Sequence, residues 1–174
     1  MIVVAVINEK FLRDMMKVAL SWPLAALLVT GAAHSATPDN ATLFFCARAA
    51  LFAESFTEGT DANKSRQESV TAAVALLNST FKDKVDEATL KLLFPWAVVA
   101  DKLPGYKPYT KGSYVAVSCI GALSEAVYVP FQKPEVPPQV RSFLDTCEAK
   151  GSREAVGQCI KSGFTSLPLE KLDK

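Results

Sequence analysis

Four cysteines constrain the fold of this 174-residue chain more than any other feature of its sequence. Between Cys46, Cys119, Cys147 and Cys159 lie 72, 27 and 11 residues, so no two cysteines are closely spaced. Structural zinc, haem attachment and iron–sulfur clusters need close cysteine pairs or histidine ligands. A thioredoxin-like redox site needs a Cys-x-x-Cys motif. The spacing therefore predicts disulfides, with no metal site and no cofactor.

An apolar segment near the start predicts that the protein reaches a compartment where thiols oxidise. Met16-Lys17 precedes an almost wholly apolar run, residues 18–31, and the small residues at 32–36 suit a signal peptidase. Pro23 and the short length of the run argue against a permanent spanning helix. Gly31 and the polar residues 37–40 argue against the alternatives, an uncleaved anchor or a first core helix. We expect a periplasmic or extracellular protein with no stable membrane span after cleavage.

The chain divides into three expected parts. We interpret residues 1–15 as an upstream extension from a start codon assigned too early, 16–36 as the signal peptide, and 37–174 as a single helical domain. A composition of 49% hydrophobic and 21% charged residues is that of a globular protein, not a disordered one. The formal net charge of +1 lacks the basic excess that nucleic-acid binding requires, so we expect no nucleic-acid partner.

Hydrophobic periodicity predicts an all-α fold, a single compact bundle of about five to six helices stabilised by disulfides. Strand patterns are weak throughout the chain. Local capping and breaking residues set the expected boundaries. The first three expected helices are 40–59 with Asn40 as N-cap and Gly59 as stop, one that begins at Ser65 with Glu68 in a capping box, and about 86–103, kinked or split at Pro95. The other three are a central helix at 113–129, one from Pro138 to Gly151, and one that is capped by Ser152 and closed by Gly163.

Four cysteines allow three pairings, and we favour Cys46 with Cys119 and Cys147 with Cys159. The second pair would join adjacent helices across one tight turn. On the chain-entropy model the long loop contributes about 4 kcal/mol and the short one about 3 kcal/mol.

One segment interleaves basic and aromatic residues with turn residues, and we predict it as a surface that binds an anion or a partner. It lies in the stretch 104–112 and just before it, which we expect to be a loop. The alternative is a solvated connector whose tyrosines pack on helix ends. The candidate binding residues are Lys102, Tyr106, Lys107, Tyr109 and Lys111.

Ser79-Thr80-Phe81-Lys82 places a serine and a lysine on one helical turn and resembles the nucleophile motif of penicillin-recognising serine enzymes. The resemblance implies a nucleophilic Ser79. Those enzymes also use a Lys-Thr-Gly strand, whereas residues 110–112 read Thr-Lys-Gly. We therefore interpret Ser79 as a helix-end residue and predict no catalytic residue.

Two acidic groups offer carboxylates that a glycoside hydrolase would need. The alternative is that they are solvated charges beside helix ends, where Asp86 and Glu87 suit a helix N-terminus. The groups are Glu54, Glu58 and Asp61, and Asp83, Asp86 and Glu87.

The sequence favours a noncatalytic protein that binds a protein partner, because the one histidine, His34, falls in the expected signal. A cysteine in the first expected helix and another after a Tyr-rich loop resemble, in layout, small periplasmic immunity proteins that protect against amidase effectors of type VI secretion. The resemblance covers about residues 40–127 and implies an inhibitor or immunity protein against a secreted effector. The alternatives are a carboxylate-dependent hydrolase and a carrier of a small apolar ligand lined by Phe45, Phe52, Phe56, Phe94 and Trp96.

Overall fold

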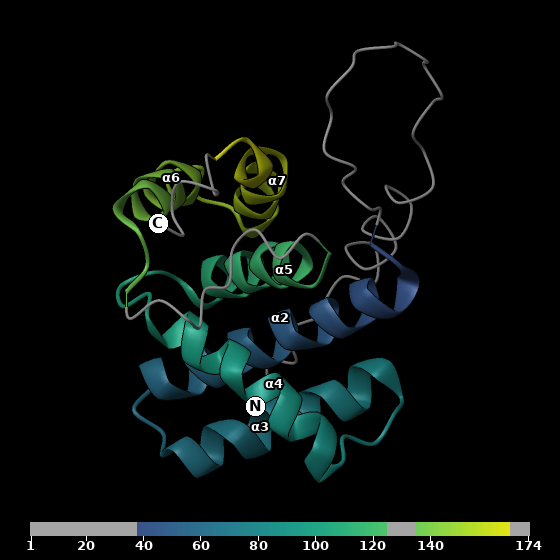
Figure 1. Ribbon diagram of the computed structural model, residues 1–174. Coiled ribbons are helices and arrows are strands. Elements are labelled where there is room, and N and C mark those ends of the chain that lie inside the picture. Colours follow the sequence, from purple (N-terminus) through teal and green to yellow (C-terminus); the bar gives the residue numbers. More distant parts are fainter. Residues whose placement is uncertain (1–37, 125–134, 168–174) are drawn as a thin grey trace. The chain divides into compact units, whose positions relative to one another are not determined.

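Six α-helices make up the fold in the computed structural model, which describes residues 38–124 and 135–167 (Figure 1). Within those ranges there is no β-strand, so the predicted compact all-α fold is confirmed. The expected extension at 1–15 and signal at 16–36 lie outside the described residues. The elements are α2 (Asn40–Asp61), α3 (Arg66–Phe81), α4 (Glu87–Asp101), α5 (Pro108–Ser124), α6 (Pro138–Glu148), α7 (Arg153–Gly163) and the 3-10 turn η2 (Phe164–Ser166).

Most helices begin at residues whose side chains cap free backbone N–H groups. Ser65 and Glu68 form the predicted capping box of α3, Ser152 caps α7, and Pro138 occupies the first turn of α6. Asn40 is not the N-cap of α2, because the Asp39 carboxylate accepts the backbone N–H of Thr42 at 2.6 Å. An anionic cap also suits the positive end of the helix dipole.

Gly59 does not stop α2, which continues to Asp61. The residue is buried where α2 meets α3, and a Cβ there would lie 2.4 Å from Ser69 Oγ. Its missing side chain therefore allows the two helices to approach closely, a tertiary role that a local stop signal does not reveal.

Pro95 does not split the third predicted helix, since α4 is continuous from Glu87 to Asp101. Its side chain lies on the exposed side of the helix. A proline on the solvent side can be accommodated by gentle bending, because the carbonyl that loses its donor is not buried against another element.

Helix α5 begins at Pro108, five residues before the expected start at 113. Proline suits a first helical position because its missing N–H would be unpaired there anyway. The backbone N–H groups of Thr110 and Lys111 both donate to the Lys107 carbonyl and close the first turn. The predicted end at 129 lies outside the described residues.

Helix α5 packs against α2, α4 and α7 (Figure 1). Helix α2 in turn contacts α3 and α4, while α6 packs against α7. Within the described residues no helix is long and apolar enough to cross a membrane.

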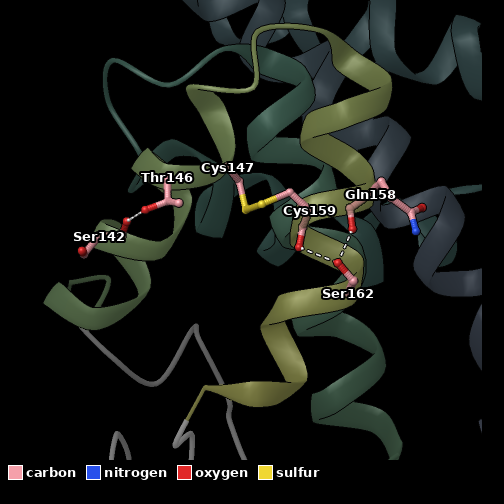
Figure 2. The surroundings of a disulfide bond; sticks show 6 residues. All are labelled: Ser142, Thr146, Cys147, Gln158, Cys159 and Ser162. Carbon is pink, nitrogen blue, oxygen red and sulfur yellow. Dashed lines mark hydrogen bonds between the residues drawn. A yellow bond between two sulfur atoms is a disulfide. The ribbon is translucent and has the colours of Figure 1, made fainter.

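Both predicted disulfides are present. Cys46 in α2 is bonded to Cys119 in α5, and Cys147 in α6 to Cys159 in α7, with a Cα–Cα distance of 5.5 Å in each pair. Figure 2 shows the second disulfide between two helices whose nearby hydroxyls are bonded to their own backbone: Ser162 Oγ donates to the Gln158 carbonyl at 2.8 Å. The two bonds therefore close two separate parts of the bundle.

Aromatic side chains of the core pack on one another. The ring centroids of Phe52 and Phe56 are 6.3 Å apart, and those of Phe56 and Phe94 are 6.0 Å apart in an edge-to-face arrangement. Phe52, Phe56 and Trp96 are almost fully buried. These contacts are those of an ordinary aromatic core.

Candidate functional site

The predicted binding segment connects α4 to the α6–α7 pair. Tyr106 donates its hydroxyl to the Arg141 carbonyl at 3.2 Å and to the Asp145 carboxylate. Partial burial, the hydrogen bond to Asp145 and the negative charge there raise the pKa of Tyr106 to about 12. Tyr109 donates its hydroxyl to the Gly151 carbonyl at 3.0 Å. Tyr106 thus contacts the middle of α6, whereas Tyr109 contacts the backbone just after the end of α6, so packing on a helix end, the alternative interpretation of this segment, describes Tyr109.

Backbone contacts strengthen the same connection. The N–H of Lys107 donates to Glu148 Oε1 at 3.0 Å, and Arg141 Nη2 donates to the Lys102 carbonyl at 3.1 Å. The Lys107 ammonium lies 5.6 Å from the centre of the Tyr109 ring. The structure brings Lys102, Tyr106, Lys107 and Tyr109 together, and Lys107 is the exposed cation among them.

Lys111 lies elsewhere. The predicted loop 104–112 is wrong at its end, because Tyr109 and Lys111 belong to α5. The Lys111 side chain is 2% exposed, and its Nζ donates to both carboxylate oxygens of Asp61 at 2.9 and 3.1 Å. Lys111 therefore ties α5 to the end of α2.

The first acidic group is used inside the fold. Arg153 holds Glu54 through two contacts of 2.8 and 2.9 Å, which join α7 to α2. Burial raises the pKa of Glu54 despite the nearby Arg153 charge. Because Asp61 pairs with Lys111, two carboxylates of this group are ion-pair partners within the bundle, and Glu58 is exposed.

The second acidic group lies at helix ends. Asp86 caps α4 by accepting the N–H of Thr89 at 2.7 Å, and Glu87 pairs with Lys91 at 2.7 Å within the same helix. Hydrogen bonds from Thr89, with a smaller contribution from the Arg48 charge, hold the pKa of Asp86 below its usual value. These contacts match the helix-end interpretation.

Ser79 also has the surroundings of a helix-end residue. Its hydroxyl is exposed and donates to the Leu76 carbonyl at 2.9 Å. Lys82 follows the last turn of α3 with a left-handed backbone, φ 53°. The hydroxyl is therefore engaged by the backbone of its own helix.

Arg48 is a site residue that sequence reasoning missed. Its guanidinium carbon lies 5.6 Å from the centre of the Phe44 ring and 5.8 Å from that of Phe81. Nη1 donates to Asp83 Oδ2 at 3.2 Å, across 35 residues of sequence. We call Phe44, Arg48, Phe81 and Asp83 the Phe44–Arg48 surface.

Two donors of Arg48 have no acceptor in the part of the chain that the structure describes. The residue is 8% exposed, and Nε and Nη2 are both buried without a hydrogen-bond partner among the described residues. Phe44, whose ring packs edge-to-face on Phe81 at 5.2 Å, is 48% exposed. The surface thus joins an exposed aromatic ring to a buried arginine with unused hydrogen-bonding capacity.

A weak sequence signal marks this arginine. Arg48 stands four residues after Phe44 and four before Phe52, within an otherwise apolar helical stripe. A charged residue at such a position must find partners in the folded protein. The sequence alone does not identify Asp83 or Phe81 as those partners.

Comparison with known proteins adds no functional assignment: no family model, curated protein or solved structure matches this chain. Among the described residues, no group of three or more His, Cys, Asp or Glu side chains is placed to hold a metal ion.

Proposed function

We propose that this protein is an exported, noncatalytic binding protein that recognises a protein partner through the Phe44–Arg48 surface. The observation that carries the proposal is the buried edge of Arg48, with two unpaired donors, beside the exposed ring of Phe44. Aromatic and arginine side chains dominate the energetic centres of protein interfaces.

The two disulfides support the exported location, because such bonds persist mainly in oxidising compartments. The Cys46–Cys119 disulfide also anchors the helix that carries Phe44 and Arg48, since Cys46 lies between them on α2 and bonds to α5. A preorganised surface loses less conformational entropy when it binds.

A particular form of this function is inhibition of a secreted effector. An inhibitor needs a rigid surface that stays folded outside the cytosol, and a small disulfide-bonded helical bundle meets that requirement. The apolar-ligand carrier is less favoured, because Phe52, Phe56 and Phe94 pack on one another.

The test is cross-linking and capture from the exported fraction under oxidising conditions, with three forms of the full chain. Phe44→Ser removes the exposed ring, whereas Leu92→Ser is the matched control, since Leu92 on α4 is 62% exposed. We expect one partner to be recovered by wild type and by Leu92→Ser, and to be lost with Phe44→Ser. Equal recovery with Phe44→Ser, or no partner with wild type, would contradict the proposal.

A further inference from the structure

We infer that the group recognised at the Phe44–Arg48 surface is a carboxylate, an acidic side chain or chain end of the partner, which pairs in bidentate fashion with Nε and Nη2 of Arg48. The inference rests on the proposed function and specifies the chemistry of the same surface.

The arrangement of the guanidinium donors carries the argument. Arginine presents its donors in a planar fork, and the edge formed by Nε and Nη2 matches the two oxygens of a carboxylate. Asp83 contacts Nη1, at 3.2 Å, and no described residue accepts a hydrogen bond from Nε or Nη2. Both free donors point into buried surroundings, where an unmade hydrogen bond is costly. A carboxylate would satisfy both donors together.

Phe44 provides the route to that edge. The two rings shield the guanidinium, but Phe44 lies near the start of α2 and about half of its surface faces solvent. Exposed side chains change rotamer on a picosecond to nanosecond timescale. Of the two rings beside the guanidinium, we therefore assign Phe44 as the one whose rotation gives the partner access, and the inference requires this movement.

Nearby charges favour a carboxylate over a phosphate. Asp83 pairs with Arg48, and Asp86 lies close enough to feel the arginine charge. Two acidic neighbours repel a dianion more strongly than a monoanion. The adjacent rings of Phe44 and Phe81 also provide apolar contacts for the carbon skeleton that carries a carboxylate.

The test uses benzoate as the probe and follows the Nε–H resonance of Arg48 in the oxidised full chain by NMR. We expect benzoate to shift this resonance with saturation in the millimolar range, and the neutral isostere benzamide to leave it unchanged. Tighter binding of inorganic phosphate would overturn the carboxylate assignment. An equal shift with benzamide, or none with benzoate at tens of millimolar, would overturn the site.

Three variants distinguish loss of recognition from loss of folding. In each, benzoate binding is followed by the ring resonances of Phe44 and Phe81, which all three variants retain. Arg48→Lys keeps the positive charge but loses the planar pair of donors that contacts both carboxylate oxygens. We therefore expect benzoate to bind at least about tenfold more weakly to this variant. Asp83→Asn removes a competing negative charge and should strengthen binding a few-fold. Leu92→Ala should leave it unchanged. Unchanged binding in Arg48→Lys, or weakened binding in Asp83→Asn or Leu92→Ala, would refute the inference.

Failure of this inference and failure of the proposed function give different results. If the partner is captured in a Phe44-dependent manner but benzoate does not bind, the function stands and the carboxylate chemistry is wrong. If benzoate binds but capture does not depend on Phe44, the site chemistry stands and the partner surface is elsewhere.

Discussion

The α2–α5 part of the bundle and the α6–α7 pair are held together by different means. Helices α2 to α5 are 15 to 22 residues long and share a core that includes Phe52, Leu77, Leu93 and Tyr114. Helices α6 and α7 have 11 residues each, a length at which an isolated helix is marginal in water. The C-terminal pair therefore depends more on cross-links and docking.

Polar contacts provide much of that docking. Tyr106, Tyr109, Arg141 and Arg153 form hydrogen bonds or ion pairs that join the C-terminal pair to the rest of the bundle. The α2–α5 part has polar connections too, Lys111 with Asp61 and Arg48 with Asp83, and both cations are largely buried. Helices α6 and α7 also contribute buried side chains to the same core, among them Leu144 and Ile160, so the polar contacts add to the core packing of two short helices.

The largest expected effect is loss of the Cys46–Cys119 disulfide. The double variant Cys46→Ala/Cys119→Ala removes a cross-link between residues that are 73 positions apart in the sequence. Because the unfolded chain then gains conformational entropy, we expect the free energy of unfolding to fall by about 4 kcal/mol. Chemical denaturation measures this value. Because both cysteines are fully buried between α2 and α5, the whole transition should move to lower denaturant. An unchanged denaturation midpoint would show that this disulfide does not stabilise the bundle.

Loss of the Cys147–Cys159 disulfide should have a smaller and more local effect. Its separation is 12 residues, and Cys147→Ala/Cys159→Ala should cost about 3 kcal/mol. We expect amide hydrogen exchange to accelerate in α6 and α7 while α2 to α5 stay protected. Uniform acceleration in all six helices would show that the two regions do not differ as we argue.

The next largest effect is expected at Gly112, where α5 lies close to α2. In Gly112→Ala the new Cβ would lie 2.9 Å from Glu54 Cβ and 3.1 Å from the Ala50 carbonyl oxygen, so we expect a loss of about 1–3 kcal/mol in unfolding free energy. Gly121→Ala on the same helix is the control, because its Cβ meets nothing within 4 Å and should stabilise α5 slightly. Thermal unfolding measures the stability of both variants. If Gly121→Ala is destabilised and Gly112→Ala is not, the prediction is wrong.

The smallest effect concerns the attachment of the second region. Tyr106→Phe removes the hydroxyl bonded to Arg141 and Asp145, and should cost about 1 kcal/mol near neutral pH.

Burial and these contacts raise the pKa of Tyr106 from 10.0 to about 12, so the folded protein holds this proton more tightly than the unfolded chain does. The resulting stabilisation is complete below pH 10 and is lost as the pH rises to 12. Denaturation across this range should show the loss in wild type and in Tyr109→Phe, but not in Tyr106→Phe. The same loss in Tyr106→Phe would assign it to another group.

Local chemistry explains which parts of the fold were predictable from sequence. Ser65 with Glu68, Ser152 and Pro138 act on their own helix ends, so their patterns predicted the helix starts correctly. Gly59 was misinterpreted because its neighbour is a serine on another helix.

The candidate site was predictable only in part, for the same reason. Tyr106 and Tyr109 were singled out by composition, but the acceptors of their hydroxyls lie 35 to 42 residues away, so the sequence could not reveal that they join this segment to α6 and to Gly151. Arg48 was missed because its role depends on Phe81 and Asp83, which only the packing of α2 against α3 brings near.

The most direct test of the account is a cysteine map of the protein isolated from its native cells, with free thiols blocked at lysis and peptides analysed without reduction. We predict linked peptides joining Cys46 to Cys119 and Cys147 to Cys159, no blocked thiol, and an amino terminus just after residue 35 or 36. A chain that retains residues 16–36 and carries four blocked thiols would contradict export, both cross-links and the binding role that depends on them.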